Sequence, residues 1–276
     1  MADWEEVADH PGYRGLCRAL LDATGPARGE RILDIGTGTG IVPELIRRYG
    51  PGEVRVTAVD PDPRMVGLAS RYTDPGHCVV GGFGNLRPLF APASFDCAVA
   101  ANSLHLAPDV SRAVHEVAGL LVPGGRFALL TGYFDGAQAP ESVPVYTRVL
   151  RRALRIAREE GVLGRDRITL RPGTDQVTVL RRAALGEDLV EAGFHVIHDD
   201  IHPLDIDAGL AAAMVSADMI AGAVFTGPTP QESTKILRRA VAEVAPGLTA
   251  GTLRRNYLLI VARLQTPVET EDWRDR

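Results

Sequence analysis

Cysteine is scarce in this sequence, and its three copies lie far apart. Cys17, Cys78 and Cys97 are odd in number and share no close spacing, so neither a disulfide framework nor a cysteine-based zinc site is expected. The acidic residues 1–6 lack the basic and apolar regions of a signal peptide. A reducing, cytoplasmic compartment is therefore the simplest expectation.

Concentrated basic charge and long apolar runs are also missing. Lys235 is the single lysine, and the formal net charge is −5 at pH 7, which argues against a nucleic-acid partner. The longest apolar stretch, residues 208–225, is interrupted by Ser216 and Asp218, so we expect a buried or lid helix and no membrane span. A homodimer is left open.

The composition is that of an ordinary globular protein, with 45% hydrophobic and 24% charged residues among 276. Short apolar runs alternate with amphipathic stretches in the first half of the chain. The expected strands are 31–35, 54–59, 78–80, 95–101 and 126–131, and the expected helices are 41–49, 63–72 and 107–121. This alternation predicts an α/β fold, a doubly wound, mostly parallel, Rossmann-like sheet of seven strands.

The second half is less regular. Its expected elements are helices within 140–161 and 179–192, a loop or edge strand at 168–176, an extended segment at 194–201, a helical excursion over 208–244 and a last strand at 256–264. Without a repeat or a linker, we expect one domain over 1–276. Its expected parts are an N-terminal cap (1–27), a cofactor-binding core (28–132) and two inserted segments that cap a substrate (133–178 and 205–252).

The most informative stretch is a glycine-rich turn between the first strand and the first helix. Residues 32–40 read ILDIGTGTG, and Asp60 ends the second strand. Glycines let a ligand lie against bare backbone at a helix N-terminus, and an acidic residue at this spacing accepts hydrogen bonds from ribose hydroxyls. The pattern predicts a nucleoside-type cofactor. A dinucleotide is disfavoured, because its third fingerprint glycine falls at Ile41.

These residues resemble motif I of the class I S-adenosylmethionine (SAM) methyltransferases. The resemblance continues through AVDPD at 58–62, SFD at 94–96, LLVPGGRF at 120–127 and AGF at 192–194. Within that superfamily, LHLAPD at 104–109 resembles the ubiquinone/menaquinone-type small-molecule enzymes of the type 11 branch. The resemblance implies SAM as cofactor and S-adenosylhomocysteine as product.

Carried over residue by residue, the resemblance also assigns a cofactor site. The glycine turn contacts the ribose and methionine portion, Asp60 holds the ribose hydroxyls, and Pro61 and Met65 flank the adenine. Asn102 and Ser103 line the sulfonium end. The expected cofactor residues are Asp34, Gly36, Thr37, Gly38, Asp60, Pro61, Met65, Gly82, Phe83, Asn102 and Ser103.

Two positions depart from the family pattern. Thr37 replaces a common cysteine at a backbone-contact position, which is a harmless change. The usual Gly-Asp after the third strand, whose aspartate binds the adenine amino group, reads Gly82-Phe83-Gly84 here. Phe83 cannot accept that hydrogen bond, so we expect it to stack on the base. Asp34, two residues before the first glycine, is expected to anchor either the turn or an amino group.

Methyl transfer from a sulfonium mainly requires alignment of nucleophile, methyl and sulfur, and an acidic nucleophile benefits from a general base. His105, just beyond the carboxyl end of the fourth strand, is the expected catalytic residue. The alternative is a structural histidine that caps the following helix. Tyr133 and Asp135 follow the fifth strand and either line the acceptor pocket or are ordinary loop residues. The N-terminal segment with Trp4, His10, Tyr13 and Arg14 is expected to form a helix that either folds over the cofactor mouth or lies on the surface.

A stretch rich in metal-ligand residue types lies near the end of the chain, containing His195, His198, Asp199, Asp200 and His202. On an extended segment the side chains at 198, 200 and 202 share one face. Three residues on one strand without a distant partner are a weak metal signal, so we predict no metal and expect a solvated or pocket-lining face.

The predicted function is SAM-dependent methyl transfer to a small, largely apolar acceptor, such as a quinone or a natural product of secondary metabolism. The apolar residues of the second insertion point to a hydrophobic ligand, although core packing explains them almost as well; they are Leu210, Met214, Met219, Ile220, Val224 and Phe225. Two alternatives are a SAM-binding enzyme that does not methylate, such as a natural-product cyclase, and a non-catalytic SAM-binding protein. A nicotinamide dehydrogenase is disfavoured, since no Tyr-x-x-x-Lys pair is present.

Overall fold

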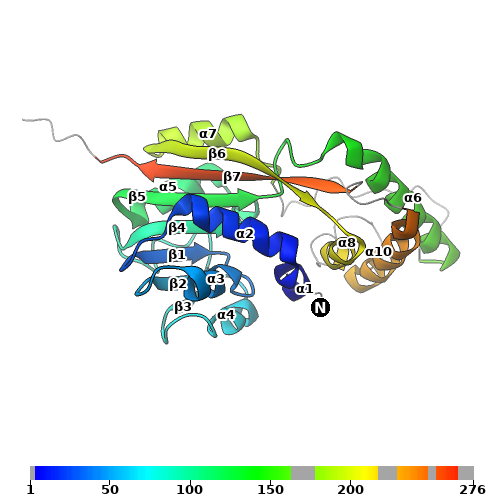
Figure 1. The fold of residues 1–276 in the computed structure, drawn as a ribbon, viewed down its shortest axis with the longest axis horizontal. Helices are drawn as coiled ribbons and strands as arrows, with labels where there is room; N and C mark the ends of the chain where they lie inside the picture. Colours follow the sequence, from blue (N-terminus) through cyan, green and yellow to red (C-terminus); the bar gives the residue numbers. More distant parts are fainter. Residues whose placement is uncertain (1–3, 163–177, 217–228, 248–252, 267–276) are drawn as a thin grey trace, which may run out of the picture.

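The computed structural model describes residues 4–162, 178–216, 229–247 and 253–266. A seven-stranded sheet runs through the molecule in the order β3-β2-β1-β4-β5-β7-β6 (Figure 1). The first five strands are mutually parallel, whereas β7 is antiparallel to both β5 and β6. The predicted doubly wound, mostly parallel sheet of seven strands is confirmed.

The strands are β1 (Arg31–Ile35), β2 (Arg55–Asp60), β3 (Cys78–Val80), β4 (Phe95–Ala101), β5 (Leu121–Thr131), β6 (Phe194–Asp205) and β7 (Arg254–Leu264). The α-helices are α1 (Trp4–Asp9), α2 (Pro11–Thr24), α3 (Ile41–Tyr49), α4 (Pro63–Ala69), α5 (Val110–Leu120), α6 (Val143–Glu159), α7 (Arg182–Glu191), α8 (Ala208–Ser216) and α10 (Pro230–Val244). Short 3-10 turns are η1 (Leu104–Leu106), η2 (Pro140–Ser142) and η3 (Ala245–Gly247).

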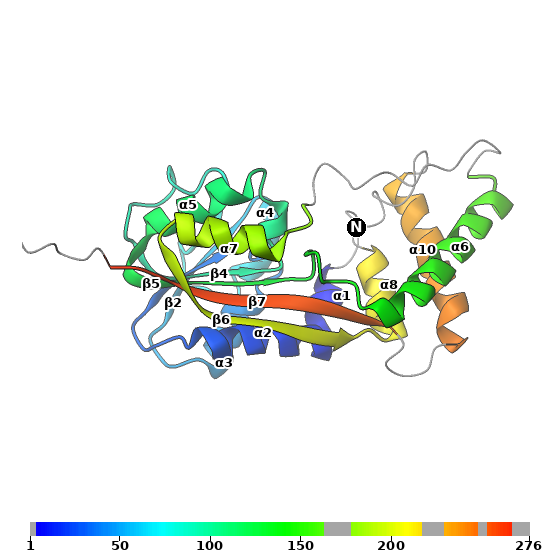
Figure 2. The ribbon, with the colours of Figure 1, turned by 90° about the horizontal axis from the view of Figure 1, so that it is seen from above.

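Helices cover both faces of the sheet, with α2 and α3 on one face and α5 and α7 on the other (Figure 2). Alternation along β4 shows why both faces are apolar, because Cys97 and Val99 belong to the core on the α2 side while Ala98 and Ala100 belong to the core on the α5 side. Helices α1, α6, α8 and α10 stand together beyond one end of the sheet (Figure 2). All three cysteines are free thiols. In the described part of the chain, no helix combines the length and apolar character needed to cross a membrane.

Several boundaries differ from those expected. Helix α5 begins at Val110, because the Asp109 carboxylate accepts a hydrogen bond from the Arg112 amide at 2.9 Å and caps the helix there. The preceding residues form the turn η1 instead of the first turn of the helix. Strand β5 starts at Leu121, directly after α5. Residues 168–176 lie outside the described residues, and so does the middle of the helical excursion over 208–244.

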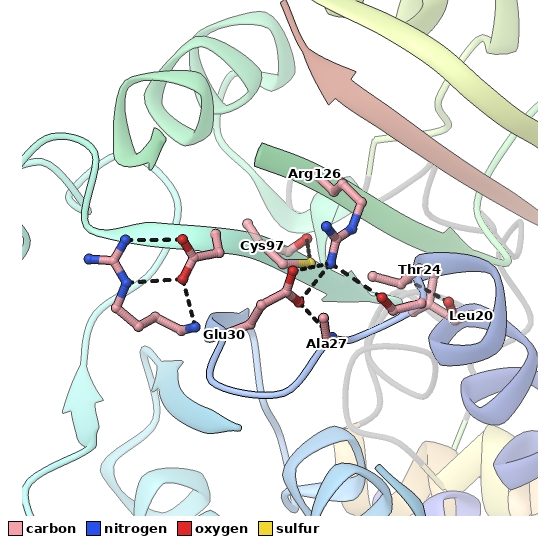
Figure 3. A network of polar contacts seen from close by, with 10 residues as sticks. Leu20, Thr24, Ala27, Glu30, Cys97 and Arg126 are labelled. Carbon is pink, nitrogen blue, oxygen red and sulfur yellow. Dashed lines mark hydrogen bonds and ion pairs between the residues drawn. The ribbon is translucent and has the colours of Figure 1, made fainter. Parts of the chain in front are cut away.

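The amino ends of the central strands are joined by ion pairs on the side away from the glycine turn. The Arg126 guanidinium donates to both Glu30 carboxylate oxygens, at 2.8 and 2.7 Å (Figure 3). A second pair joins Arg31 on β1 to Asp96 on β4 at 3.0 Å. Both members of the Arg126–Glu30 pair are mostly buried, with side chains 13% and 15% exposed. This network fixes the mutual register of β1, β4 and β5, which carry site residues at their other ends.

Candidate functional site

A cavity of about 820 Å³ opens at the carboxyl ends of β1, β2 and β4. In a parallel sheet this is where ligands bind, at the point where the strand order reverses. All eleven predicted cofactor residues line this cavity, namely Asp34, Gly36, Thr37, Gly38, Asp60, Pro61, Met65, Gly82, Phe83, Asn102 and Ser103. The structure therefore brings the whole predicted set together.

The glycine turn after β1 holds a backbone conformation that residues other than glycine rarely adopt. The amides of Gly36 and Thr37 both donate to the Val59 carbonyl, at 2.8 and 3.0 Å, which ties the turn to β2. Gly36 has a φ of 72°, and a Cβ there would lie 2.4 Å from the Cβ of Ser103. Gly38 has a φ of 54°, and a Cβ there would meet nothing within 4 Å. Gly36 is thus required for packing, whereas Gly38 leaves bare backbone facing the cavity.

Asp60 is held in place by backbone amides. Its two carboxylate oxygens accept hydrogen bonds from the amides of Gly38 and Asp62, both at 2.9 Å. Burial raises the pKa of Asp60, and the two amide hydrogen bonds oppose that rise. A carboxylate oxygen has two acceptor sites, so each oxygen retains one for a ligand hydroxyl.

Asp34 is a fully buried carboxylate on the cavity wall. Neither of its oxygens has a hydrogen-bond partner among the described residues, which is rare for a buried charged group. Burial raises the pKa of Asp34 to about 7; the Thr37 hydroxyl, close by but outside hydrogen-bonding geometry, opposes this rise, and the charge of Asp60 adds to it. A cationic ligand group fits here, because it would supply both the missing hydrogen bonds and the missing positive charge.

Two residues after β4 close the crevice between the central strands. Asn102 adopts a φ of 59°, and its side-chain oxygen accepts a hydrogen bond from the Gly132 amide at 3.0 Å. The Ser103 hydroxyl donates to the Ile35 carbonyl at 2.5 Å. A positive φ at a residue other than glycine is uncommon and clusters at ligand sites.

The loop after β3 is fixed by a carboxylate that the sequence analysis missed. The buried Glu116 on α5 accepts hydrogen bonds from the amides of Gly84, Leu86 and Arg87, at 2.8, 2.8 and 3.2 Å. This anchor positions Phe83 on the cavity wall. Asn85, which also lines the cavity, accepts from the Gly82 amide at 2.9 Å and was missed as well. The sequence offered one signal for Asn85, because its side-chain amide lies two residues after Phe83, which stands in place of the usual aspartate.

The N-terminal helices cover part of the cavity, as expected. Trp4 and Ala8 of α1 and Tyr13 of α2 are lining residues. His10 lies at the junction of the two helices, accepts a hydrogen bond from the Gly12 amide and contacts Asp207 at 3.1 Å. Arg14 does not line the cavity but pairs with Glu44 at 2.7 Å. The cap is thereby attached to α3 and to the start of α8.

His105 lies just beyond β4, as expected, but it does not line the cavity. It is 1% exposed and is absent from the cavity wall, whereas the next residue, Leu106, lines it. Its ring stacks on Tyr133 with centroids 4.1 Å apart, and its Nδ1 lies 3.3 Å from the Thr131 hydroxyl. Burial, assisted by the charge of Arg255, lowers the pKa of His105 to about 3. The expected helix-capping alternative is also wrong, since Asp109 caps α5.

The other residues that were candidates for the acceptor pocket lie elsewhere in the structure or outside its described part. Tyr133 is covered by His105 and by the Arg255 guanidinium, which lies 4.7 Å from the centroid of its ring. Asp135 accepts a hydrogen bond from the Arg182 amide at 3.4 Å. Neither Tyr133 nor Asp135 lines the cavity. Leu210 of α8 is buried in the core, and Met214 packs partly against it. The remaining predicted capping residues, Met219, Ile220, Val224 and Phe225, lie outside the described residues.

Comparison with known proteins agrees with this geometry. Residues 33–129 match the methyltransferase domain family Methyltransf_11. The chain is 34% identical over 109 residues to the ubiquinone biosynthesis O-methyltransferase of Xylella fastidiosa, covering 38% of this chain and 43% of that protein. It is 34% identical over 121 residues to the nocamycin O-methyltransferase of Saccharothrix syringae, covering 42% of this chain and 43% of that protein. The matches thus span less than half the length of these relatives.

Similarity of structure extends further along the chain. The crystal structure of the [4+2]-cyclase SpnF matches with a TM-score of 0.55 at 18% identity, covering 92% of this chain and 81% of that one. At this identity the likeness shows the fold alone. The match over residues 33–129, the motifs and the strand order agree, and this part of the chain is similar to the methyltransferase domain of class I SAM-dependent enzymes.

Proposed function

We propose that this protein transfers a methyl group from SAM to a small, largely apolar acceptor. The observation that carries the proposal is the pairing of Asp34 and Asp60 on one cavity wall with the bare backbone of Gly38 between β1 and α3. Two carboxylates beside a glycine turn suit a ligand that has both ribose hydroxyls and a positively charged amino group.

The fit to SAM rests on hydrogen-bond acceptor sites of Asp34 and Asp60 that have no partner within the described part of the protein. Asp34 accepts hydrogen bonds from the cofactor's amino group, which satisfies its two unpartnered oxygens. Asp60 accepts from the ribose hydroxyls with the acceptor sites that Gly38 and Asp62 leave free. Phe83 and Met65 offer apolar surfaces to the adenine. The volume of about 820 Å³ lies toward the upper end of the range of roughly 300–1,000 Å³ for small-molecule sites, so it also accommodates an acceptor.

The apolar acceptor follows from the rest of the lining. Besides Asp34 and Asp60, the charged lining residues that the structure describes are Asp62, which caps α4, and Arg64, which lies 3.8 Å from Asp62. The other walls are contributed mainly by apolar side chains, namely Trp4, Ala8, Ile41, Val42, Leu106 and Pro108. An acceptor beside the cofactor therefore meets mostly apolar surface, which favours a ring compound or a terpenoid over a charged metabolite.

Catalysis in this site rests on positioning. Bound SAM supplies an electrophilic methyl group on a positively charged sulfur. The glycine turn and Asn102 would fix the reacting end of the cofactor, and the cap formed by α1 and α2 would exclude water. Together these contacts would align the methyl donor with the acceptor. Holding two reactants in line lowers such a barrier by about 7–11 kcal/mol. His105 acts as a positioning residue that supports Tyr133 and the end of β5.

A second candidate function is binding of SAM without methyl transfer, because the described cavity wall offers few groups that could act as a general base. None of the described lining residues is a histidine, lysine or cysteine. An acceptor that must lose a proton therefore has to ionise in solution or use Asp34 or Tyr13. In the alternative, SAM is bound but does not react, as in a natural-product cyclase.

The test is turnover with purified protein, SAM and a panel of phenolic, quinol and terpenoid acceptors, with S-adenosylhomocysteine as the readout. We expect tight SAM binding by calorimetry and stoichiometric release of S-adenosylhomocysteine with at least one acceptor. The matched control is Asp109→Asn, an exposed carboxylate that caps α5 outside the cavity lining and should leave SAM affinity nearly unchanged. Tight SAM binding without any release across the panel would favour the non-methylating alternative, and no SAM binding would refute both.

A further inference from the structure

Three metal-ligating side chains converge on strand β6, outside the cofactor cavity. His198, Asp200 and His202 each offer a ligand atom, and these atoms all lie within 4.8 Å of one another. None of the three lines the cavity. We propose that they form a binding site for one divalent transition-metal cation of the zinc class, in place of the solvated face that the sequence alone indicates.

A β-bulge aims these side chains at one face. The pairing of β6 with β7 shifts between Val196 and His198, so Ile197 is an extra residue in the strand. Val196 packs on the α5 side of the sheet, whereas Leu204 belongs to the core on the α2 side. Because side chains alternate, the bulge transfers His198 and the residues two and four positions later to the α2 side. An unbulged strand would have pointed them at the opposite core.

Register confirms that the three share a face. His198, Asp200 and His202 pair with residues of β7 that all belong to the core on the α2 side, in order Val261, Leu259 and Tyr257. Strand β6 is the last strand of the sheet. The cluster therefore sits at a sheet edge, where Asp200 is exposed to solvent and the two Nε2 atoms lie buried beside it.

The two imidazoles carry an unmet hydrogen-bonding need. The Nε2 atoms of His198 and His202 are buried and have no hydrogen-bond partner in the part of the chain that the structure describes. The Nε2 of His202 lies 3.7 Å from the Asp200 carboxylate, too far for a hydrogen bond. Buried polar atoms are normally paired, and leaving one unpaired is destabilising. A metal ion between the two nitrogens and Oδ2 of Asp200, whose Oδ1 accepts from the Ile201 amide at 2.8 Å, would satisfy both imidazoles.

Ligand type and number suit zinc. Two histidine nitrogens and one aspartate oxygen are a common donor set, with the fourth tetrahedral position taken by water. Ligand bonds of about 2.0–2.1 Å put the donor atoms of a tetrahedral site about 3.4 Å apart, so rotation of the side chains is enough to close a cluster of 4.8 Å. The exposed Asp200, 61% accessible, has the freedom for this rotation. The set brings one negative charge, so the occupied site carries a net charge of +1.

The consequence of binding is local. Leu204, two residues beyond His202, packs so closely on α2 that a Cβ at Gly12 would lie 2.6 Å from its Cδ1. A cation that fixes the residues just before Leu204 stiffens the path from the sheet edge to the N-terminal cap and to α8. Metal binding is therefore expected to raise thermal stability, with no chemical role in methyl transfer.

The test is titration of chelator-stripped full-length protein with ZnCl₂ in competition with a chromogenic chelator. We expect one saturable site per chain, a rise in melting temperature, and a tetrahedral visible spectrum with CoCl₂. Loss of an outer-shell partner alone weakens metal affinity about 10- to 100-fold, so His198→Ala, His202→Ala and Asp200→Asn should each weaken Zn²⁺ binding by at least about 100-fold.

The control is His77→Ala, which removes a half-buried histidine on the loop before β3, far from β6 in sequence, and should leave affinity unchanged. Far-ultraviolet circular dichroism of the metal-free variants checks folding, and Asp200→Asn serves if a histidine variant fails to fold. Weak, multiple-site binding, or an equal loss of affinity in the His77 variant, would overturn the proposal. Neither result would bear on SAM binding, because the two sites share no residue.

Discussion

Replacing Asp34 by asparagine tests two effects of this buried carboxylate, namely its contribution to SAM binding and its cost to the stability of the protein without ligand. The carboxylate is fully buried and lacks partners among the described residues, and its pKa is raised to about 7. Asparagine has nearly the same shape but no charge. We expect Asp34→Asn to weaken SAM binding while it stabilises the protein without ligand.

The size of the binding effect follows from the charge and from the pKa. A hydrogen bond to a charged group contributes about 1.5–3 kcal/mol, so the variant should lose roughly 10- to 100-fold in SAM affinity at pH 8. Because the cationic amino group requires the ionised carboxylate, wild-type affinity should fall about tenfold per pH unit below the Asp34 pKa of about 7. Asp34→Asn should show no such dependence.

The stability effect has the opposite sign. The folded-state pKa of Asp34 lies above the unfolded value, so the folded protein holds the proton more tightly and stability falls as pH rises from about 4 to about 7. The full penalty, at most about 4 kcal/mol for a shift of about three units, is present above pH 7. The melting temperature of Asp34→Asn should therefore exceed that of the wild type at pH 8, and the difference should vanish toward pH 4.

Isothermal titration calorimetry and differential scanning fluorimetry from pH 5.5 to 8.5 measure both effects on the same samples. The control is Asp109→Asn, which removes an exposed helix-capping carboxylate that does not line the cavity. Equal SAM affinity and equal pH dependence in wild type and Asp34→Asn would refute the assignment of Asp34 to the amino group.

Four further changes test other parts of the site. Asp60→Ala should weaken SAM binding by about 1–3 kcal/mol in calorimetry, through the lost ribose contacts; unchanged affinity contradicts that role. Gly36→Ala should destabilise the fold by about 2 kcal/mol or more in urea unfolding, because its φ of 72° and its close neighbour both exclude a Cβ. His105→Ala should slow turnover without changing its pH profile, since the pKa of His105 is about 3; loss of a limb near neutral pH would restore the base assignment. Arg126→Ala should cost about 3–5 kcal/mol by leaving Glu30 buried and unpaired, and Arg126→Met with Glu30→Gln should recover part of that loss in a double-mutant cycle.

The parts of the site that depend on local sequence were predictable. The glycine turn and Asp60 act through backbone conformation and strand position, which the strand–turn–helix pattern encodes directly. The eleven cofactor residues converge because parallel strands bring their carboxyl ends to one edge. Short segments of sequence were therefore enough to predict a set of residues that line one cavity.

The parts that depend on distant contacts were not predictable. His105 was misplaced because η1 turns its side chain toward Thr131 and Tyr133, residues about 26 positions away, while Leu106 turns to the cavity. Glu116 was missed because its partners lie about 30 positions earlier, on another element. The shared face of His198 was expected from strict alternation, but the side of the sheet that it faces depends on a bulge that no periodicity reveals.

A crystal structure of the protein with S-adenosylhomocysteine is the most direct measurement. We expect the ligand in the cavity between β1, β2 and β4, with its ribose hydroxyls on Asp60 and its amino group on Asp34. Density for the ligand at another place, or a cavity that stays free of it at saturating concentration, would contradict the assignment of this site to SAM.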